Sequence, residues 1–189
     1  MVWVTGTTMP NWYVNNTFLE DLAFNLAEIH SRVPKNEPKT NMFKIADNLD
    51  TSEDFVKDAV NHFKRLSHNY NKNVVLHGDL WNGNIILKPD GRLSGLIDWE
   101  HTQIGDPHWE LRMIRRFIGW DGLDYLIKKY NELSVHKIKG VVEVYTLDKL
   151  ALCHQYQYRL RKNDSRTPLF RKYIDNWPEC INDISNQRI

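Results

Sequence analysis

Two short apolar runs, residues 85–87 and 93–97, lie on either side of the tight-turn sequence Pro89-Asp90-Gly91. Turn residues of this kind between two apolar runs predict a β-hairpin. In an antiparallel hairpin, residues equidistant from the turn lie opposite each other, with Cβ atoms roughly 5 Å apart. Asn84, just before the first strand, and Asp98, just after the second, are therefore expected to meet at the open end of the hairpin.

Helical patterns surround this hairpin. Apolar residues at three- and four-residue spacing predict helices at residues 18–30, starting near 51–54, from 106 onward, at 122–133 and at 141–161. Thr17 and Glu20 fit a capping box for the first of these helices. Residues 1–9, MVWVTGTTM, begin as an alternating apolar strand that breaks at Gly6. The expected fold class is α+β and mostly helical, and 189 residues suit one domain or one large lobe.

The overall charge is close to neutral, because 25 Lys and Arg stand against 24 Asp and Glu. This balance does not indicate a partner such as nucleic acid or an anionic membrane. No apolar run is long enough to span a bilayer, and no signal-peptide pattern opens the sequence. The only cysteines, Cys153 and Cys180, show no metal-ligand spacing, so we expect a reduced, cytoplasmic protein without a zinc site.

The sequence HGDLWNGNI begins at His77, directly after the apolar run 74–76. Its spacing His-x-Asp-x-x-x-x-Asn is that of the kinase catalytic loop, in which the aspartate is the base and the asparagine binds Mg²⁺. A carboxylate at the position of Asp79 can accept a hydrogen bond from a substrate hydroxyl and orient it for in-line attack on a phosphoryl group. Asn84 and Asp98 supply hard oxygen atoms of the kind that suit Mg²⁺.

Turn chemistry is the alternative explanation for these polar residues, since Asp and Asn favour loops and helix caps. It accounts for Asp79, Asn84 and Asp98 one at a time. It does not account for their joint spacing, which favours a site for phosphoryl transfer.

Three motifs follow one another in the sequence: HGDLWNGNI, then LIDWE, then GDPHWEL. Together they resemble the aminoglycoside phosphotransferase and choline kinase-like family. The resemblance implies a protein-kinase-like fold and an enzyme that transfers a phosphoryl group from ATP or GTP, with Mg²⁺, to a hydroxyl group of a small molecule. The resemblance extends over almost the entire chain.

The resemblance also implies roles for individual residues. Asp79 is expected to be the catalytic base, and His77 is expected to brace the loop that carries it. Asn84 and Asp98 are expected to bind Mg²⁺. Glu100 falls where related proteins often carry a second acidic residue near the metal.

Two further positions are expected to support the loop. Gly78 stands where protein kinases have Arg. Within GDPHWEL the family more often has Asp at the place of Glu110, and this side chain is expected to hydrogen-bond the backbone of the loop from a buried helix. Glu110 is one methylene longer than Asp, so we expect a small difference in the position of the loop.

The sequence departs from the family pattern at its beginning. Kinase-like enzymes cover the nucleotide phosphates with a Gly-rich loop and place a strand Lys on them. Residues 1–189 contain no G-x-G-x-x-G and no V-A-I-K-like strand before His77. Residues 1–9 resemble instead the hinge strand that lines the adenine pocket, with Trp3, Val4 and Thr5 expected to contact the nucleotide. We therefore expect residues 1–189 to form only the C-terminal lobe, with an N-terminal lobe supplied by upstream sequence, a partner chain or a dimer.

A second hypothesis is a kinase-derived binding module without catalysis, because the phosphate-clamping segments are not among these residues. The intact base and metal ligands argue against it. The sequence does not identify the small molecule that accepts the phosphoryl group, although basic residues between 159 and 172 argue against a polycationic acceptor. His101 and His108 are expected to face solvent or to lie in the first turn of a helix. The basic run 112–116 is expected to be a solvated helix face or a grip for a phosphate or acidic partner.

Overall fold

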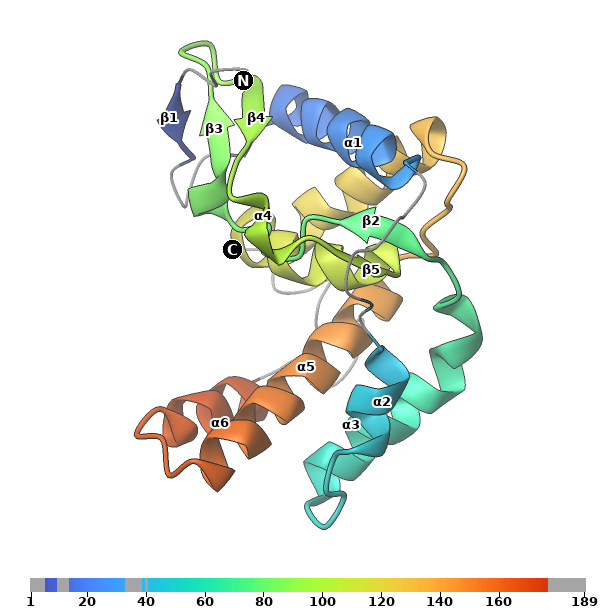
Figure 1. Ribbon diagram of the computed structural model, residues 1–189, viewed down its shortest axis with the longest axis vertical. Coiled ribbons are helices and arrows are strands. Elements are labelled where there is room, and N and C mark those ends of the chain that lie inside the picture. Colours follow the sequence, from blue (N-terminus) through green and yellow to red (C-terminus); the bar gives the residue numbers. More distant parts are fainter. Residues whose placement is uncertain (1–5, 10–13, 33–38, 40, 177–189) are drawn as a thin grey trace. The chain divides into compact units, whose positions relative to one another are not determined.

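The computed structural model describes residues 6–9, 14–32, 39 and 41–176 (Figure 1). The chain divides into two compact units, Met1–Thr40 with Lys72–Val141 and Asn41–Asn71 with Val142–Ile189. The first unit contains β1 (Thr7–Thr8), α1 (Asn16–His30), β2 (Val74–Leu76), η2 (Asn82–Asn84), β3 (Ile85–Leu87), β4 (Leu93–Leu96), η3 (Trp99–His101), β5 (Gln103–Gly105) and α4 (Pro107–Leu133). The second unit contains α2 (Met42–Asp47), α3 (Asp54–Leu66), η1 (Ser67–Asn69), α5 (Val141–Arg161) and α6 (Thr167–Asp175). The expected mostly helical α+β fold is confirmed.

The strands of the first unit form two antiparallel sheets, β1-β3-β4 and β2-β5. The predicted hairpin is present as β3 and β4, but its register shifts at a β-bulge, where β4 accommodates Ser94 as an extra residue. An extra residue in one strand moves the pairing beyond it by one position. The N–H of Ile97 therefore donates to the carbonyl oxygen of Asn84 (3.0 Å). The prediction that Asp98 lies opposite Asn84 is wrong by one residue.

The first helix covers the predicted span but begins differently. The side chain of Asn15 is the N-cap and accepts a hydrogen bond from the N–H of Phe18 at 2.8 Å. The predicted capping box at Thr17 is therefore wrong, because Asn15 fills the cap position two residues earlier. The apolar face of α1 packs against α4 and β2 (Figure 1), and Leu22 on this face is fully buried.

Helix α4 carries the predicted start signals. Asp106 is the N-cap and accepts a hydrogen bond from the N–H of His108 at 3.1 Å, and Pro107 follows at the first helical position. The backbone at Gly119 (φ 71°, ψ −176°) is not helical and kinks the helix. The kink separates two segments, in agreement with the separate helices predicted from 106 onward and at 122–133.

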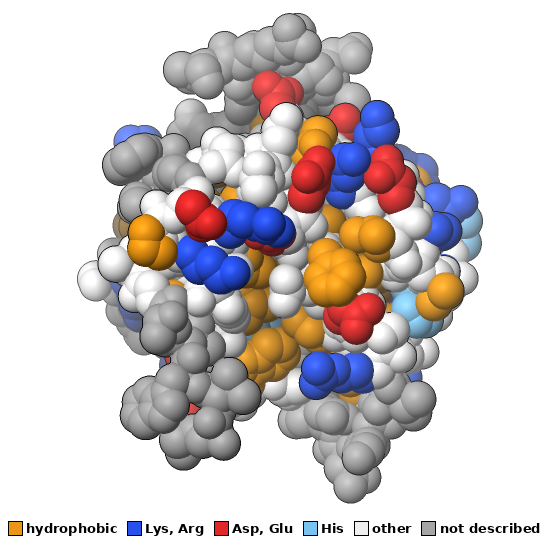
Figure 2. Space-filling model, turned by 90° about the horizontal axis from the view of Figure 1, so that it is seen from above, with side chains coloured by type: hydrophobic (Ala, Val, Ile, Leu, Met, Phe, Trp, Pro, Cys, Tyr) orange, Lys and Arg blue, Asp and Glu red, His pale blue; other side chains and the backbone are white. Residues whose placement is uncertain are grey.

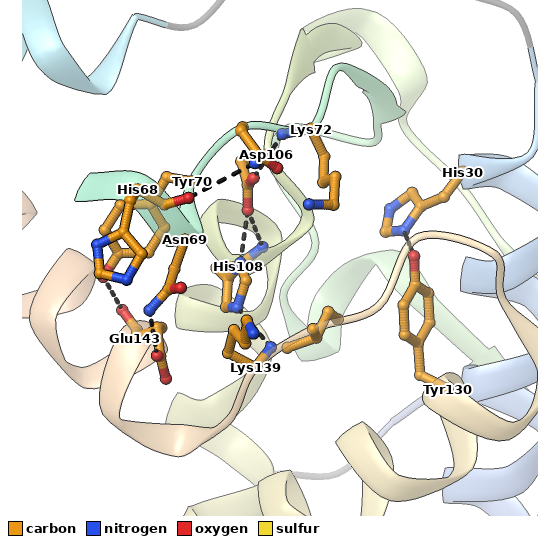
Figure 3. A network of polar contacts seen from close by, with 12 residues as sticks. His30, His68, Asn69, Tyr70, Lys72, Asp106, His108, Tyr130, Lys139 and Glu143 are labelled. Carbon is orange, nitrogen blue, oxygen red and sulfur yellow. Dashed lines mark hydrogen bonds and ion pairs between the residues drawn. The ribbon is translucent and has the colours of Figure 1, made fainter. Parts of the chain in front are cut away.

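The second unit is helical, and the predicted helix 141–161 is confirmed as α5. Asn69 donates to a carboxylate oxygen of Glu143 at 2.8 Å, and the Tyr70 hydroxyl donates to the Glu143 carbonyl at 3.0 Å (Figure 3). These bonds join η1 to the first turn of α5. Cys153 in α5 is a free thiol, and burial raises its pKa to about 12. Cys180 lies outside the described residues.

The surface shows both signs of charge. On the face in Figure 2, Lys and Arg side chains are interspersed with Asp and Glu side chains. This mixture agrees with the near-neutral charge of the sequence. Within the described part of the chain, every helix is too short or too polar to cross a membrane.

An ion pair ties the hairpin to α1 and gives a pH-dependent prediction. The guanidinium of Arg92 donates to both carboxylate oxygens of Asp21 (3.0 and 2.6 Å), and the N–H of Leu93 donates at 3.1 Å. The hydrogen bond from Arg92 holds the pKa of Asp21 below its usual value. A carboxyl group with a lowered pKa in the folded state contributes stability above its unfolded pKa, and this contribution is lost as the pH falls.

We expect Asp21→Asn to lower the free energy of unfolding by about 1 kcal/mol at pH 7. The difference from the native protein should shrink as the pH falls below about 4, where unfolded aspartate becomes protonated. Urea unfolding of both proteins at pH 7 and pH 3 measures it. An equal difference at the two pH values would show that the charge of Asp21 is not the cause.

Candidate active site

His77 opens the loop of residues 77–84, which we name the catalytic loop. The loop connects β2 to β3. The His77 side chain is fully buried, and its Nε2 atom lies 2.8 Å from the carbonyl oxygen of Ile97, so Nε2 carries the proton and donates. Its Nδ1 atom accepts from the N–H of Asp79 at 3.4 Å. The imidazole also contacts the Trp99 ring, with ring centroids 4.4 Å apart. His77 thus ties the loop to the segment that follows β4.

Asn84 closes the loop and is bound to Asp79. The amide nitrogen of Asn84 donates to the Asp79 carbonyl oxygen at 2.8 Å and lies 3.4 Å from the Asp79 carboxylate. Both bonds use the nitrogen, which leaves the Asn84 carboxamide oxygen outside them. Asn84 is buried, whereas Asp79 is half-buried. The structure therefore brings these two predicted residues together and leaves the Asp79 carboxylate within reach of solvent.

Asp98 has an unusual backbone conformation directly after β4. Its φ and ψ angles are both 64°, in the left-handed region, and its side chain is exposed. Residues other than glycine rarely adopt this conformation, although Asp tolerates it better than most. Strained backbone of this kind often occurs at functional sites. Asp98 follows Ile97, which is hydrogen-bonded to Asn84, so the two expected metal ligands lie at the same end of the hairpin.

Glu100 lies in the 3-10 helix η3 and points to solvent. Its side chain is 73% exposed and forms a pair with the exposed side chain of His101 at 3.7 Å. Nothing in the described residues fixes Glu100 against Asn84 or Asp98. The assignment of Glu100 to a metal site stays a prediction.

The donor atoms at the open end of the hairpin fit Mg²⁺. The carboxamide oxygen of Asn84 and the carboxylate of Asp98 are hard oxygen donors, and Mg²⁺ commonly takes one or two carboxylates together with waters and substrate phosphates. Among the residues that the structure describes, no three His, Cys, Asp or Glu side chains are grouped so as to hold a metal. A site of this composition therefore depends on Asn84 and on oxygens that a phosphate ligand brings.

Gly78 occupies a position that a larger residue cannot enter. Its φ angle is 86°, and a Cβ atom placed on it would lie 1.9 Å from the carbonyl oxygen of His101. Glycine meets both demands because it lacks Cβ and adopts positive φ at little cost. The loop can therefore cross close to η3 only with glycine here.

Glu110 reaches the loop from the first turns of α4. One carboxylate oxygen accepts from the N–H of His77 at 3.1 Å, and the other accepts from the N–H of Gly78 at 3.0 Å. Glu110 is buried, at 3% exposure. The carboxylate thus binds two consecutive backbone amides at the point where β2 becomes the catalytic loop.

His30 and Tyr130 also belong to this region, and no motif in the sequence pointed to them. The Nε2 atom of His30 lies 3.3 Å from a carboxylate oxygen of Glu110. Its Nδ1 atom lies 2.9 Å from the Tyr130 hydroxyl (Figure 3). Burial raises the pKa of Tyr130 to about 12, so its hydroxyl stays protonated. The sequence pattern that could have indicated the burial of His30 is its spacing, because Leu22, Leu26 and His30 recur every four residues on the apolar face of α1.

A second polar cluster fixes the start of α4. Asp106 contacts Nδ1 of His108 at 2.6 Å and accepts from the N–H of Lys72 at 3.0 Å, and Nε2 of His108 accepts from the N–H of Lys139 at 3.0 Å (Figure 3). His108 lies in the first helical turn, as one alternative predicted, and it is fully buried. His101 is exposed to solvent, which was the other predicted position. The histidine of GDPHWEL therefore holds the backbone that positions α4.

The basic run 112–116 is not simply a solvated helix face. The guanidinium groups of Arg112 and Arg115 lie over the rings of Trp109 and Trp120, at 4.1 and 4.6 Å from the ring centroids. Such cation–π contacts stabilise partly buried arginines. Arg116, by contrast, is exposed.

Trp3, Val4 and Thr5, the residues expected to contact a nucleotide, lie outside the described residues. The rest of the predicted hinge strand is described from Gly6 onward, and β1 follows Gly6, whereas we expected the strand to break there. The N–H of Met9 donates to the Ile85 carbonyl at 3.0 Å, and Asn82 donates to the Met9 carbonyl at 3.1 Å. The segment is thus attached to the catalytic loop and to β3.

The second unit has a cavity of its own. Its volume is about 470 Å³, and it is lined by Phe55, Asp58, Asn61, His62, Arg65, Lys149, Ile174 and Asp175. Burial, with help from Arg65 and Lys149, lowers the pKa of His62, which favours the neutral form of this imidazole. None of the site residues predicted from the sequence lines the cavity.

The fold is that of the kinase-like phosphotransferases. A macrolide 2′-phosphotransferase type I is 19% identical to this chain, with a TM-score of 0.64 and coverage of 92% of this chain and 65% of that one. A choline kinase from Streptococcus pneumoniae is 18% identical, with a TM-score of 0.68 and coverage of 93% and 69%. An aminoglycoside 2′-phosphotransferase IIIa, in its GDP complex, is 16% identical, with a TM-score of 0.70 and coverage of 97% and 69%.

The chain belongs to the phosphotransferase enzyme family, whose sequence model matches residues 3–131. The family resemblance expected from the three motifs is thereby confirmed. No curated protein sequence matches the chain. The chain spans 65% of the length of the macrolide phosphotransferase and 69% of the length of the other two structures.

Proposed function

We propose that this chain carries the catalytic and acceptor-side half of an enzyme that transfers a phosphoryl group from a nucleoside triphosphate to a hydroxyl group of a small molecule. The observation that carries this proposal is the arrangement of Asn84. Its amide nitrogen donates to Asp79, and its backbone carbonyl accepts from the N–H of Ile97, the residue before the exposed Asp98. Its carboxamide oxygen takes no part in these bonds. Membership of the phosphotransferase enzyme family supports the same function.

In this proposal, Asp79 accepts a hydrogen bond from the acceptor hydroxyl and then takes its proton. Its half-buried carboxylate suits this role because the acceptor can approach it from solvent. Asn84 holds Asp79 in place, and His77 and Glu110 hold the loop backbone. Mg²⁺, when bound through Asn84 and Asp98, would neutralise charge on the phosphate groups of the nucleotide.

The nucleotide is proposed to be ATP or GTP. One aminoglycoside phosphotransferase neighbour was solved with GDP, and another solved neighbour, a choline kinase, was solved with AMP. Residues 1–189 contain no Gly-rich loop and no V-A-I-K-like strand before His77. We therefore propose that full activity requires a nucleotide-clamping lobe from sequence upstream of Met1 or from a partner chain.

Calorimetric titration with Mg²⁺-ATP tests the metal site. The chain is expected to bind weakly, and Asp98→Ala is expected to abolish the binding because it removes the carboxylate that is proposed to bind Mg²⁺ together with Asn84. Asp90→Ala is the matched control, since Asp90 is an exposed aspartate in the turn at the other end of the same hairpin. Equal binding by the native protein and Asp98→Ala would contradict the assignment of Asp98.

Activity is tested with a version of the protein extended upstream. We expect this version to phosphorylate at least one compound in a broad panel of hydroxyl-bearing small molecules. If it binds no nucleotide and phosphorylates none of them, the proposal fails and the alternative of a silent kinase-derived binding module is favoured.

A further inference from the structure

His30 is a fully buried histidine at the end of α1, far in sequence from the three motifs. We propose that His30 and Tyr130 form a positioning chain for the catalytic loop, in which Tyr130 holds His30 and His30 holds Glu110. Calling the loop catalytic rests on the proposed function. The positioning of its backbone does not, and it can be measured without any assay of activity.

The positioning chain of side chains consists of consecutive hydrogen bonds inside the first unit. The Tyr130 hydroxyl lies 2.9 Å from Nδ1 of His30, and Nε2 of His30 lies 3.3 Å from Oε2 of Glu110. Oε2 also accepts from the N–H of His77 (3.1 Å), while Oε1 accepts from the N–H of Gly78 (3.0 Å). A contact from α1 therefore reaches the first two residues of the loop through a single carboxylate.

The orientation of Glu110 depends on more than the loop itself. An ionised carboxylate that is 3% exposed is costly unless hydrogen-bond donors surround it. The two loop amides supply donors on one side only, and glutamate has one more rotatable bond than the aspartate that is more frequent in the family. His30 adds a donor to Oε2 from another helix. This third bond removes the freedom that the longer side chain would otherwise have.

The direction of the His30–Glu110 bond does not depend on the charge of the imidazole. A carboxylate oxygen can only accept, so Nε2 carries a proton and donates in both the neutral and the charged form. In the neutral form Nδ1 accepts from the Tyr130 hydroxyl, and in the charged form it donates to the same oxygen. The rings also meet edge to face, with centroids 5.5 Å apart. Tyr130 therefore fixes the ring plane of His30 in either state.

The positioning chain of side chains also connects the two parts of α4 on either side of its kink. Glu110 lies before Gly119 and Tyr130 lies after it, so His30 bridges the two segments of this helix. A kinked helix can bend at its non-helical residue. The bridge fixes the segment that carries Glu110 relative to the segment that carries Tyr130, which keeps the carboxylate at a constant distance from the loop.

Amide hydrogen exchange of the whole chain, followed by NMR, tests the proposal. His30→Ala is expected to speed exchange at the N–H groups of His77 and Gly78 by about 10- to 100-fold, because a hydrogen bond to a charged group is lost from their acceptor. Other slowly exchanging amides of the first unit should change much less. Tyr130→Phe, which removes only the hydroxyl, should give the same pattern with a smaller increase.

Leu123→Ala is the control for a general loss of stability, since Leu123 is fully buried in the same unit and lies outside the chain of contacts. It should speed exchange throughout the unit without selecting the loop. His30→Gln restores a side-chain N–H donor and should recover most of the protection at His77 and Gly78. A merely structural histidine would not be rescued in this selective way.

Uniform acceleration in His30→Ala, matching that in Leu123→Ala, would overturn the proposal. If His30→Ala does not fold, Tyr130→Phe decides in the same way. A double-mutant cycle gives a second test: once Glu110→Gln is present, adding Tyr130→Phe should have little further effect on the loop amides, because the path through the carboxylate is already broken. Additive effects would show that His30 and Tyr130 do not act through Glu110.

Discussion

Gly78→Ala is expected to lower the free energy of unfolding by about 3 to 5 kcal/mol, because it combines a left-handed backbone with overpacking against η3. The new Cβ atom would lie 1.9 Å from the carbonyl oxygen of His101, and this backbone oxygen cannot swing aside as the end of a side chain can. The loop must therefore move away from η3. Urea unfolding monitored by tryptophan fluorescence measures the loss, because Trp81 and Trp99 flank the displaced segment.

Gly119→Ala is the matched control. Gly119 also has a positive φ (71°), but a Cβ atom there would meet nothing within 4 Å. Its substitution isolates the conformational cost, about 1 to 3 kcal/mol. The loss of unfolding free energy in Gly78→Ala should exceed this cost. The displacement of the loop should also break the hydrogen bond from the N–H of residue 78 to Glu110. Equal losses for the two variants would show that the close approach to His101 is not what requires glycine at position 78.

Asp79→Asn is expected to reduce phosphoryl transfer by about 10²- to 10⁴-fold, the range typical for loss of a general base. The carboxamide has the same shape but cannot take a proton at neutral pH. The strongest bond from Asn84 goes to the backbone carbonyl of residue 79, at 2.8 Å, so the loop should keep its position. Folding and the binding of Mg²⁺-ATP should change little.

The measurement is kcat/KM of the upstream-extended protein with the acceptor found by screening. Asp90→Asn is the control, because it makes the same chemical change in the exposed turn of the hairpin and should leave the rate unaltered. A fully active Asp79→Asn enzyme would show that the base is assigned to the wrong residue.

Features encoded locally could be predicted from the sequence. The hairpin followed from Pro89-Asp90-Gly91, and the start of α4 followed from Asp106-Pro107, because turn and cap residues act on the backbone within a few positions. The same holds for the spacing from His77 to Asn84, which marked the loop. The capping box at Thr17 failed because Asn15 competes for the same role with a side chain of similar chemistry.

Features that depend on distant partners could not be predicted. The bulge at Ser94 depends on how both strands pack, and it moves Asp98 one residue past the position opposite Asn84. His30 and Glu110 are 80 residues apart, and a histidine on an apolar helix face carries no sign of which carboxylate it will meet. The position of His108 likewise depends on a distant segment, because its Nε2 accepts from the N–H of Lys139. Its other partner, Asp106, accepts from the N–H of Lys72 in a further segment.

The attachment of β1 has a mechanical consequence. Thr7 and Thr8 pair with β3, Met9 is bonded to Ile85, and Asn82 grips the carbonyl of Met9. Hydrogen bonds therefore join the entering strand both to β3 and to the loop that ends at Asn84. A pull or rotation applied to the chain at Thr7 would reach Ile85, the neighbour of the residue that holds Asp79, through these hydrogen bonds and without passing through α1 or α4.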